Sequence, residues 1–409
     1  MIRNTMAGLL LLLFPACSPL LLPSSEEYDP VEASLLAWTG PDAVTLVWNN
    51  YQLPYLDNPG ASNPDSYQVL MSDQGAASLV EVAQTAQQSL KIQGLTPGKS
   101  YWFAVESRFS DGETRRSNIV MASPGSVASA ILETSAAGFA ANRITLASGT
   151  ILVQGQSPDM RWTLAFQGQT PLTTGRDAAA HPNLDQFAFV TDLDDQIAFP
   201  QPNNFLATWH IADSSYVILS SGYDFIRRPN WDAAGDRLVF LGAASPTEAA
   251  EVRILLTSAA LPNISNFVVG KQDEYTGAGT PGPDFPSFHP TKNAVVMDLP
   301  SFETGALGRN IHLINLENQL DTVLVSSPWR DTQPSIHPSG NTMLFVSDRS
   351  GIDAIWQLDL ISKELRQITG GESDPVPSRD YPLTWSKSGD SCWFTSFSSG
   401  TAQPVELVF

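Results

Sequence analysis

The alternation of apolar and polar residues is clearest in the segment Asp331–Gly371. Such alternation predicts half-buried strands, and turn residues separate one strand from the next. A short strand, Pro334–His337, is followed by the apolar run Thr342–Ser347, which fits a strand buried on both faces. Two more strands, Ala354–Leu360 and Leu365–Thr369, complete the segment. Four antiparallel strands joined by tight turns are typical of one blade of a β-propeller.

Five other stretches carry weaker copies of this pattern. Four contain a recognisable turn after the first strand, and they span His181–Val190, Pro229–Phe240, Pro286–Met297 and Leu383–Phe394. One further copy is reconstructed from its later strands, at Thr150–Gly155, Arg161–Phe166 and Pro171–Thr174. The equivalent turn positions are 48 to 57 residues apart, as in propeller repeats, and they fall at Leu184, Gly235, Lys292, Gly340 and Gly389. The pattern therefore predicts six blades, and a seventh stays open.

The strongest copy also contains specific motifs, namely PSIHPSG, SDRSG, IWQLDL and RQIT. This run resembles the WD-like repeat of the TolB family of β-propellers. The resemblance implies a propeller over residues 125–409, in which an early strand completes the last blade. Ala128–Thr134 is then expected to pair near Val405–Phe409, which would remove exposed sheet edges, and a plain linker is the alternative.

A second unit precedes these repeats, at residues 31–124. Its alternating strands have the spacing of a β-sandwich, and they are Ala43–Trp48, Ser66–Ser72, Ser89–Leu95, Tyr101–Arg108 and Ser117–Ala122. The segment Leu95–Tyr101 resembles the tyrosine corner of fibronectin type III domains, and Trp48 matches their core tryptophan. The expected fold class is all-β, a fibronectin type III-like sandwich followed by a six-bladed propeller. In the long connection Asn49–Asp65, the aromatic rings either contact a partner or pack onto the sandwich.

The first 17 residues contain one Arg, a leucine-rich stretch and a small residue before Cys17, as a secretory signal does. The sequence FPAC resembles a bacterial lipobox, which implies a lipid on Cys17. Ser18, in place of the Asp that retains such proteins at the inner membrane, implies the outer membrane. Cleavage without a lipid and an uncleaved anchor are the alternatives. Residues 18–30 are expected to be a tether.

Charge and cysteine content narrow the possible partners. The 409 residues include 22 basic and 42 acidic side chains, which give a net charge of −20. Nucleic acids and anionic lipid surfaces are disfavoured, because phosphate binding requires clustered Lys and Arg. With Cys17 lipidated, Cys392 would be a buried free thiol, and no disulfide framework is available.

The best candidate site is a recurring charged pair before the first strand of a repeat. Arg–Asp pairs, with an Arg–Arg pair in one copy, occur at Arg176, Asp177, Arg227, Arg228, Arg330, Asp331, Arg379 and Asp380. These positions fall in the loops between blades, which surround the funnel of a propeller. They indicate either ion pairs between blades with capping of turns by Asp, or a polar ring that receives a peptide or a small anionic group.

Other candidate chemistry is weaker. His181, His289 and His337 occupy one repeat position, which favours a structural role at a strand end over a metal site. The acidic run Asp192–Asp195 lacks the glycine and terminal glutamate of a calcium loop and is interpreted as a solvated turn. The sequence contains no G-x-S-x-G, H-E-x-x-H or phosphate-loop motif. No metal and no cofactor are expected.

These features together predict a non-enzymatic, lipid-anchored envelope protein. Its propeller would bind a protein or peptide partner, or a glycan, and the fibronectin-like unit would be a spacer or adhesion module. The alternative is an extracellular hydrolase or lyase that acts on a glycan, lactone or peptide through the funnel. A subunit of an envelope transport assembly is a third hypothesis, which follows from the family resemblance alone.

Overall fold

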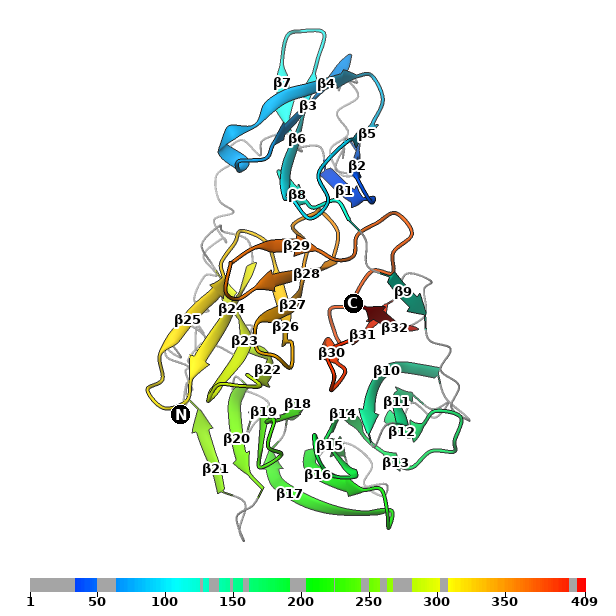
Figure 1. Ribbon diagram of the computed structural model, residues 1–409, viewed down its shortest axis with the longest axis vertical. Coiled ribbons are helices and arrows are strands. Elements are labelled where there is room, and N and C mark those ends of the chain that lie inside the picture. The colour runs from blue at the N-terminus through cyan, green and yellow to red at the C-terminus, as the bar shows by residue number, and fades with distance from the viewer. Residues whose placement is uncertain are drawn as a thin grey trace, which may run out of the picture.

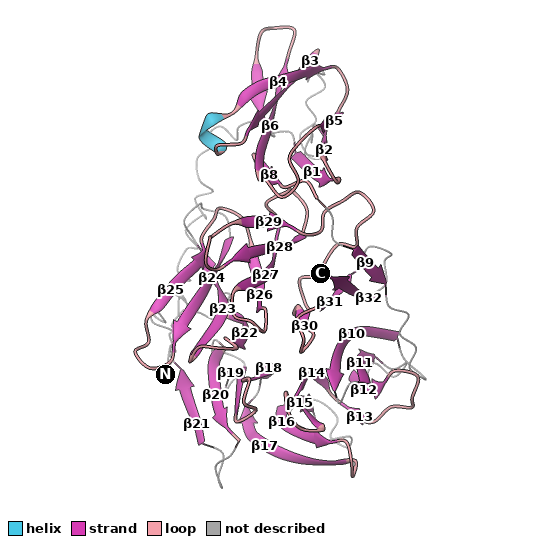
Figure 2. Cartoon of the chain, viewed as in Figure 1, coloured by secondary structure: helices cyan, strands magenta, loops and turns pink. Residues whose placement is uncertain are grey.

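The computed structural model describes residues 34–49, 64–125, 128–131, 140–147, 150–156, 162–191, 204–223, 225–243, 250–257, 263–267, 282–301, 308–396 and 403–409. The predicted signal peptide with Cys17, the tether, the loop that contains Tyr51 and Tyr55, and the acidic run Asp192–Asp195 lie outside these residues. The described chain is almost entirely strands, with one short 3-10 turn, Ala76–Ser78 (Figure 2). No helix in the described part is long and apolar enough to cross a membrane.

The N-terminal strands form a two-sheet sandwich (Figure 1). One sheet has the order β1-β2-β5, with bounds Ser34–Thr39, Ala43–Asn49 and Ser89–Gln93. The other has the order β4-β3-β6-β7, with β8 also paired to β6; the bounds are Val80–Thr85, Ser66–Ser72, Tyr101–Arg108, Thr114–Arg116 and Val120–Ala122. Trp48 is fully buried between the sheets and meets Tyr67 edge-on at 5.4 Å. The Tyr101 hydroxyl accepts a hydrogen bond from the Thr96 amide at 3.0 Å, which is the contact expected of a tyrosine corner.

Six four-stranded sheets in the described residues form the propeller, as the repeats predict (Figure 1). Blades 1 to 3 are β10–β13 (Ala140–Ala147, Thr150–Gln156, Trp162–Phe166, Thr173–Thr174), β14–β17 (Arg176–Ala180, Gln186–Thr191, Asn204–His210, Ser215–Tyr223) and β18–β21 (Phe225–Trp231, Arg237–Ala243, Glu251–Leu256, Asn263–Phe267). Blades 4 and 5 are β22–β25 (Asp284–Phe288, Ala294–Ser301, Gly308–Asn315, Asp321–Val325) and β26–β29 (Asp331–Ile336, Thr342–Ser347, Ala354–Asp359, Leu365–Gln367). Blade 6 has the order β30-β31-β32-β9, with bounds Thr384–Trp385, Ser391–Ser396, Gln403–Val408 and Ala128–Ile131.

The ring closes through β9, as the family resemblance implied. Ala128 lies opposite Val408 and Ile131 opposite Val405, so a strand from before blade 1 supplies the outer edge of blade 6. This pairing ties the two ends of the propeller together and leaves no blade incomplete in the described residues. Several strands that the alternation did not indicate are also present, among them β1, β4, β7 and β10.

Apolar side chains of neighbouring blades form shared cores. Phe187 and Phe189 of blade 2 pack with Leu152 and Leu164 of blade 1, and the same arrangement repeats around the ring. Cys392 is fully buried in the core between blades 5 and 6, and burial raises the pKa of its thiol. The predicted buried free thiol is therefore confirmed.

The repeated histidines hold adjacent blades together at their turns. His181 Nε2 lies 3.1 Å from the carbonyl of Gly235 in the next blade, and His337 Nε2 lies 3.3 Å from that of Gly389. Both glycines have positive φ, and a Cβ at either position would overlap the imidazole. The predicted structural role is thus confirmed for these two histidines. No three His, Cys, Asp or Glu side chains of the described residues are grouped as a metal site requires.

The sandwich is docked on blade 5 through backbone hydrogen bonds. The Ala37 amide donates to the Ser350 carbonyl at 2.8 Å, and the Met121 amide donates to the Arg349 carbonyl at 2.8 Å. The Thr39 amide donates to Gly370 at 2.9 Å. Met121 also belongs to the apolar core between blades 4 and 5. The loop 348–353 between β27 and β28 is therefore fixed on its outer side by the sandwich.

Candidate functional site at the propeller channel

Four consecutive blades carry the same irregularity in their innermost strand. β14, β18, β22 and β26 each contain a register shift near their start. A residue other than glycine adopts a left-handed conformation at each shift, with φ of 54° at Asp177, 55° at Arg228, 49° at Phe285 and 55° at Gln333. We call these four residues the channel ring. Left-handed conformations of such residues cost about 1–3 kcal/mol each and cluster at functional sites.

Each shift removes an amide from the strand ladder, and a side chain accepts it. The Asp177 amide donates to Gln154 Oε1 of blade 1 at 2.5 Å, and the Arg228 amide donates to Asp177 Oδ2 of blade 2 at 3.2 Å. The Gln333 amide donates to Asp298 Oδ2 of blade 4 at 3.1 Å. The Phe285 amide donates to Asp284 Oδ1 of its own strand at 2.9 Å, so three of the four ring amides are held by the preceding blade.

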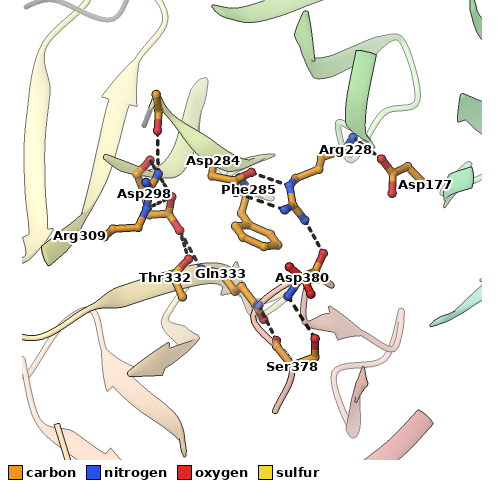
Figure 3. A network of polar contacts seen from close by, with 11 residues as sticks. Asp177, Arg228, Asp284, Phe285, Asp298, Arg309, Thr332, Gln333, Ser378 and Asp380 are labelled. Atoms are coloured by element: carbon orange, nitrogen blue, oxygen red, sulfur yellow. Dashed lines mark hydrogen bonds and ion pairs between the residues drawn. The ribbon is translucent and has the colours of Figure 1, made fainter. Parts of the chain in front are cut away.

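Arg228 spans the channel (Figure 3). Its guanidinium forms an ion pair with Asp284 of blade 4, with Nε 2.5 Å from Oδ1, and it donates to the Asp380 carbonyl before blade 6 at 2.9 Å. The guanidinium also lies 3.5 Å from the centroid of the Phe285 ring. Because Asp177 accepts its backbone amide, Arg228 of blade 3 contacts blades 2, 4 and 6 together. It therefore links the blades on opposite sides of the channel.

A second buried ion pair supports the ring from blade 4. Arg309 donates to Asp298 Oδ1 through Nη2 at 2.6 Å and through Nε at 2.9 Å. Asp298 is fully buried and also accepts the Thr332 hydroxyl of blade 5. Gln333 in turn donates from Nε2 to the Ser378 carbonyl at 2.7 Å. Blades 4, 5 and 6 are thereby linked at the channel (Figure 3).

A cavity of about 740 Å³ lies within the channel, and residues of all six blades line it. Arg228 and Phe285 are the ring residues that contribute to its wall. Three hydroxyl side chains at equivalent positions on blades 4, 5 and 6 also line it, and these are Ser287, Ser335 and Thr384. Their hydroxyls make no hydrogen bond to any described residue. The cavity thus offers neutral polar groups on one side and small apolar residues, such as Ala178, on the other.

Only some residues of the predicted charged pairs reach the channel ring. Asp177 and Arg228 belong to the channel ring, and Asp380 joins it through its carbonyl. Asp331, two residues before the ring residue of its blade, is fully buried in an ion pair with Arg349 and is not accessible to a ligand. Arg227 is exposed, with its guanidinium 5.6 Å from the Phe225 ring centroid.

Arg330 and Arg379 approach each other beside the channel, on the loops that connect blades 5 and 6 to their neighbours. The Arg330 amide donates to Asp348 Oδ1 at 2.9 Å, and Arg379 Nη2 lies 3.7 Å from Asp348 Oδ2. Arg379 also forms a bidentate ion pair with Asp353, at 2.6 and 2.7 Å. Arg176 opens β14 on another blade and is partly exposed.

Phe285 and Gln333 of the ring were not singled out in the sequence, although a signal exists. Each precedes the proline of its repeat, at Pro286 and Pro334, as the predicted Arg228 precedes Pro229. Proline lacks an amide, so it fits a register shift where the ladder offers no acceptor. The residue before the repeat proline therefore marks the channel ring.

Comparisons with known proteins found similarity to solved structures alone. No protein-family model matches the chain, and no curated protein matches it either. Among solved structures, TolB from Acinetobacter baumannii is 10% identical, with 76% of each chain covered and a TM-score of 0.46. An oligogalacturonate lyase from Vibrio parahaemolyticus is 10% identical, with 92% of this chain and 97% of that chain covered and a TM-score of 0.46. A puromycin-hydrolyzing peptidase from Mycobacterium tuberculosis is 13% identical, with 76% and 50% covered and a TM-score of 0.45. The likeness concerns the fold alone.

Proposed function

We propose that the protein is a non-enzymatic binding protein that holds a protein or peptide partner at the propeller channel. The main support for this proposal is the strained backbone conformation of the channel ring. Four blades place a residue other than glycine at positive φ in the same position, and the ring is held rigid by contacts between blades. Strain of this kind persists where the surroundings over-determine it, and it pre-organises a surface for binding.

The charge arrangement of the channel also supports binding over catalysis. Asp284 and Asp298, two carboxylates beside the ring, are each paired with an arginine. Each of these carboxylates is therefore engaged by a guanidinium of its own chain and is not free to approach a substrate. The free hydroxyls of Ser287, Ser335 and Thr384 are suited to hydrogen bonds with a bound chain.

The sandwich is a fixed part of this platform in the proposal, and we assign residues 31–124 to a fibronectin type III-like domain. A spacer would leave the two parts free to move, whereas the backbone hydrogen bonds of Ala37, Thr39 and Met121 attach the sandwich to blade 5. The N-terminal sequence supports secretion, a lipid on Cys17 and retention at the outer membrane. The domain division at residue 125 is part of the same proposal.

The test is capture of a partner from detergent-solubilised envelopes with residues 18–409 as bait, followed by titration of the purified partner. The proposal expects saturable binding that weakens at least tenfold in an Arg228→Gln variant, while Arg115→Gln, a change on the sandwich surface, leaves it unchanged. A screen of the same proteins against polysaccharides, esters and peptides, with and without Ca²⁺, addresses the alternative. Turnover that is lost in Arg228→Gln would replace the binding function by a hydrolase or lyase.

A further inference from the structure

Three arginines gather beside the channel ring, and one of them forms no ion pair with a described residue. Arg309 is paired with Asp298, and Arg379 is paired with Asp353. The Arg330 guanidinium makes no hydrogen bond or ion pair to any described residue. Its Nε is completely buried. A half-buried cation without an ion-pair partner among the described residues is costly, and this sets Arg330 apart from the paired Arg228, Arg309 and Arg349.

A β-bridge and a hydrogen bond fix the position of the Arg330 backbone. Arg330 and Arg309 form a parallel β-bridge, which sets two arginines side by side. The amide of Arg330 is held by Asp348, whose other carboxylate oxygen lies 3.7 Å from Arg379. Burial, with the positive charges of Arg379 and Arg309, holds the pKa of Arg330 below its usual value. The positive charges around Arg330 would therefore favour a bound anion at its guanidinium.

The sandwich contacts the loop that positions Arg330 and Arg379. Asp348 and Asp353 stand at the two ends of the loop 348–353, which the sandwich contacts at Arg349 and Ser350. A Cβ at Gly351 would overlap the Leu35 backbone, so the approach is close. The same loop thus receives the sandwich on one side and positions Arg330 and Arg379 on the other.

We infer that Arg330, with Arg379 beside it, binds a carboxylate of the partner. This inference rests on the proposed function and names the group that the partner presents. A guanidinium with free N–H groups matches a planar carboxylate in two parallel hydrogen bonds. Phosphate would bring a second negative charge close to Asp348 and Asp353, so a singly charged carboxylate fits better.

Short peptides test the inference without knowledge of the partner. The probes are a tetraglutamate peptide with both ends blocked, a tetraglutamine peptide with a free C-terminal carboxylate, a fully blocked tetraglutamine peptide, and inorganic phosphate. Calorimetric titration of residues 18–409 at low salt should show binding of one or both carboxylate peptides, with no binding of the blocked tetraglutamine. The first two probes distinguish a side-chain source from a chain terminus. Binding should weaken as salt is added.

Variants then locate the site. Arg330→Gln should reduce the affinity of the carboxylate probe at least tenfold, Arg330→Lys should restore part of it, and Arg115→Gln should change nothing. A single unfolding transition of Arg330→Gln, at a temperature no lower than that of wild type, verifies its fold. Equal affinity in Arg330→Gln, stronger binding of phosphate than of either peptide, or no binding by wild type would each overturn the inference. Partner capture that persists in Arg330→Gln would refute the carboxylate assignment and leave the proposed function intact.

Discussion

The contact between His337 and Gly389 gives a quantitative test of how the blades are joined. Gly389 has a φ of +85°, and a Cβ there would overlap the imidazole of His337. Gly389→Ala should therefore cost about 1–2 kcal/mol for the left-handed backbone and about 1–3 kcal/mol for the forced shift of His337. The sum is a loss of about 2–5 kcal/mol in the free energy of unfolding.

Gly168→Ala is the matched control. Gly168 has a φ of +73° in blade 1, and a Cβ there would meet nothing within 4 Å. It should lose only the backbone cost, about 1–2 kcal/mol. Thermal unfolding followed by tryptophan fluorescence measures both variants, and each kcal/mol corresponds to about 2–4 °C.

A double variant separates the steric contact from other effects. In a His337→Ala background, Gly389→Ala should cost no more than Gly168→Ala does, because the overlapping ring is gone. If the two glycine substitutions lower the unfolding temperature equally in the wild-type background, His337 does not hold blade 6 by close contact, and the reasoning fails.

Three further outcomes are expected. His289 is 3% exposed, and burial lowers its pKa from 6.5 to about 4, so the folded state favours the neutral ring. This pKa difference contributes on the order of 3 kcal/mol to the free energy of unfolding, a contribution that is complete above pH 6.5 and is lost as the pH falls towards 4. Urea unfolding should therefore show a smaller loss of stability in acid for His289→Leu than for wild type. Arg228→Gln should lower the free energy of unfolding by about 3–5 kcal/mol, because Asp284 loses its partner. A decrease below about 1 kcal/mol would contradict the role of Arg228 in linking the blades. Arg330→Met should raise the unfolding temperature by about 2–4 °C, since it removes a half-buried cation that no described residue pairs, and a fall would contradict the cost assigned to Arg330.

The sequence predicted the architecture well because one local pattern repeats. Turn positions such as Gly235, Gly340 and Gly389 adopt the positive φ that only their residue type allows at no cost, so they mark each blade. The closure by β9 followed from the family resemblance rather than from alternation. The strand β10 was not indicated, although the Ser148-Gly149 dipeptide that follows it in the sequence is a turn signal.

The site was only partly predictable, because it depends on register. The shift sits at the same place in both blades, but the two Arg–Asp pairs do not. Asp177 is itself the ring residue of β14, whereas Asp331 lies two residues before Gln333, the ring residue of β26, and pairs with Arg349. The unpaired state of Arg330 depends on the positions of Asp348 and Asp353, which become neighbours only in the folded chain.

The most direct test of the account is the affinity of the purified partner for wild type, Arg330→Gln and Arg115→Gln. The account predicts saturable binding to wild type and to Arg115→Gln, with at least tenfold weaker binding to Arg330→Gln. A partner that binds all three proteins equally would show that the surface beside the channel is not the binding site, and failure to recover any saturable partner would contradict the binding function itself.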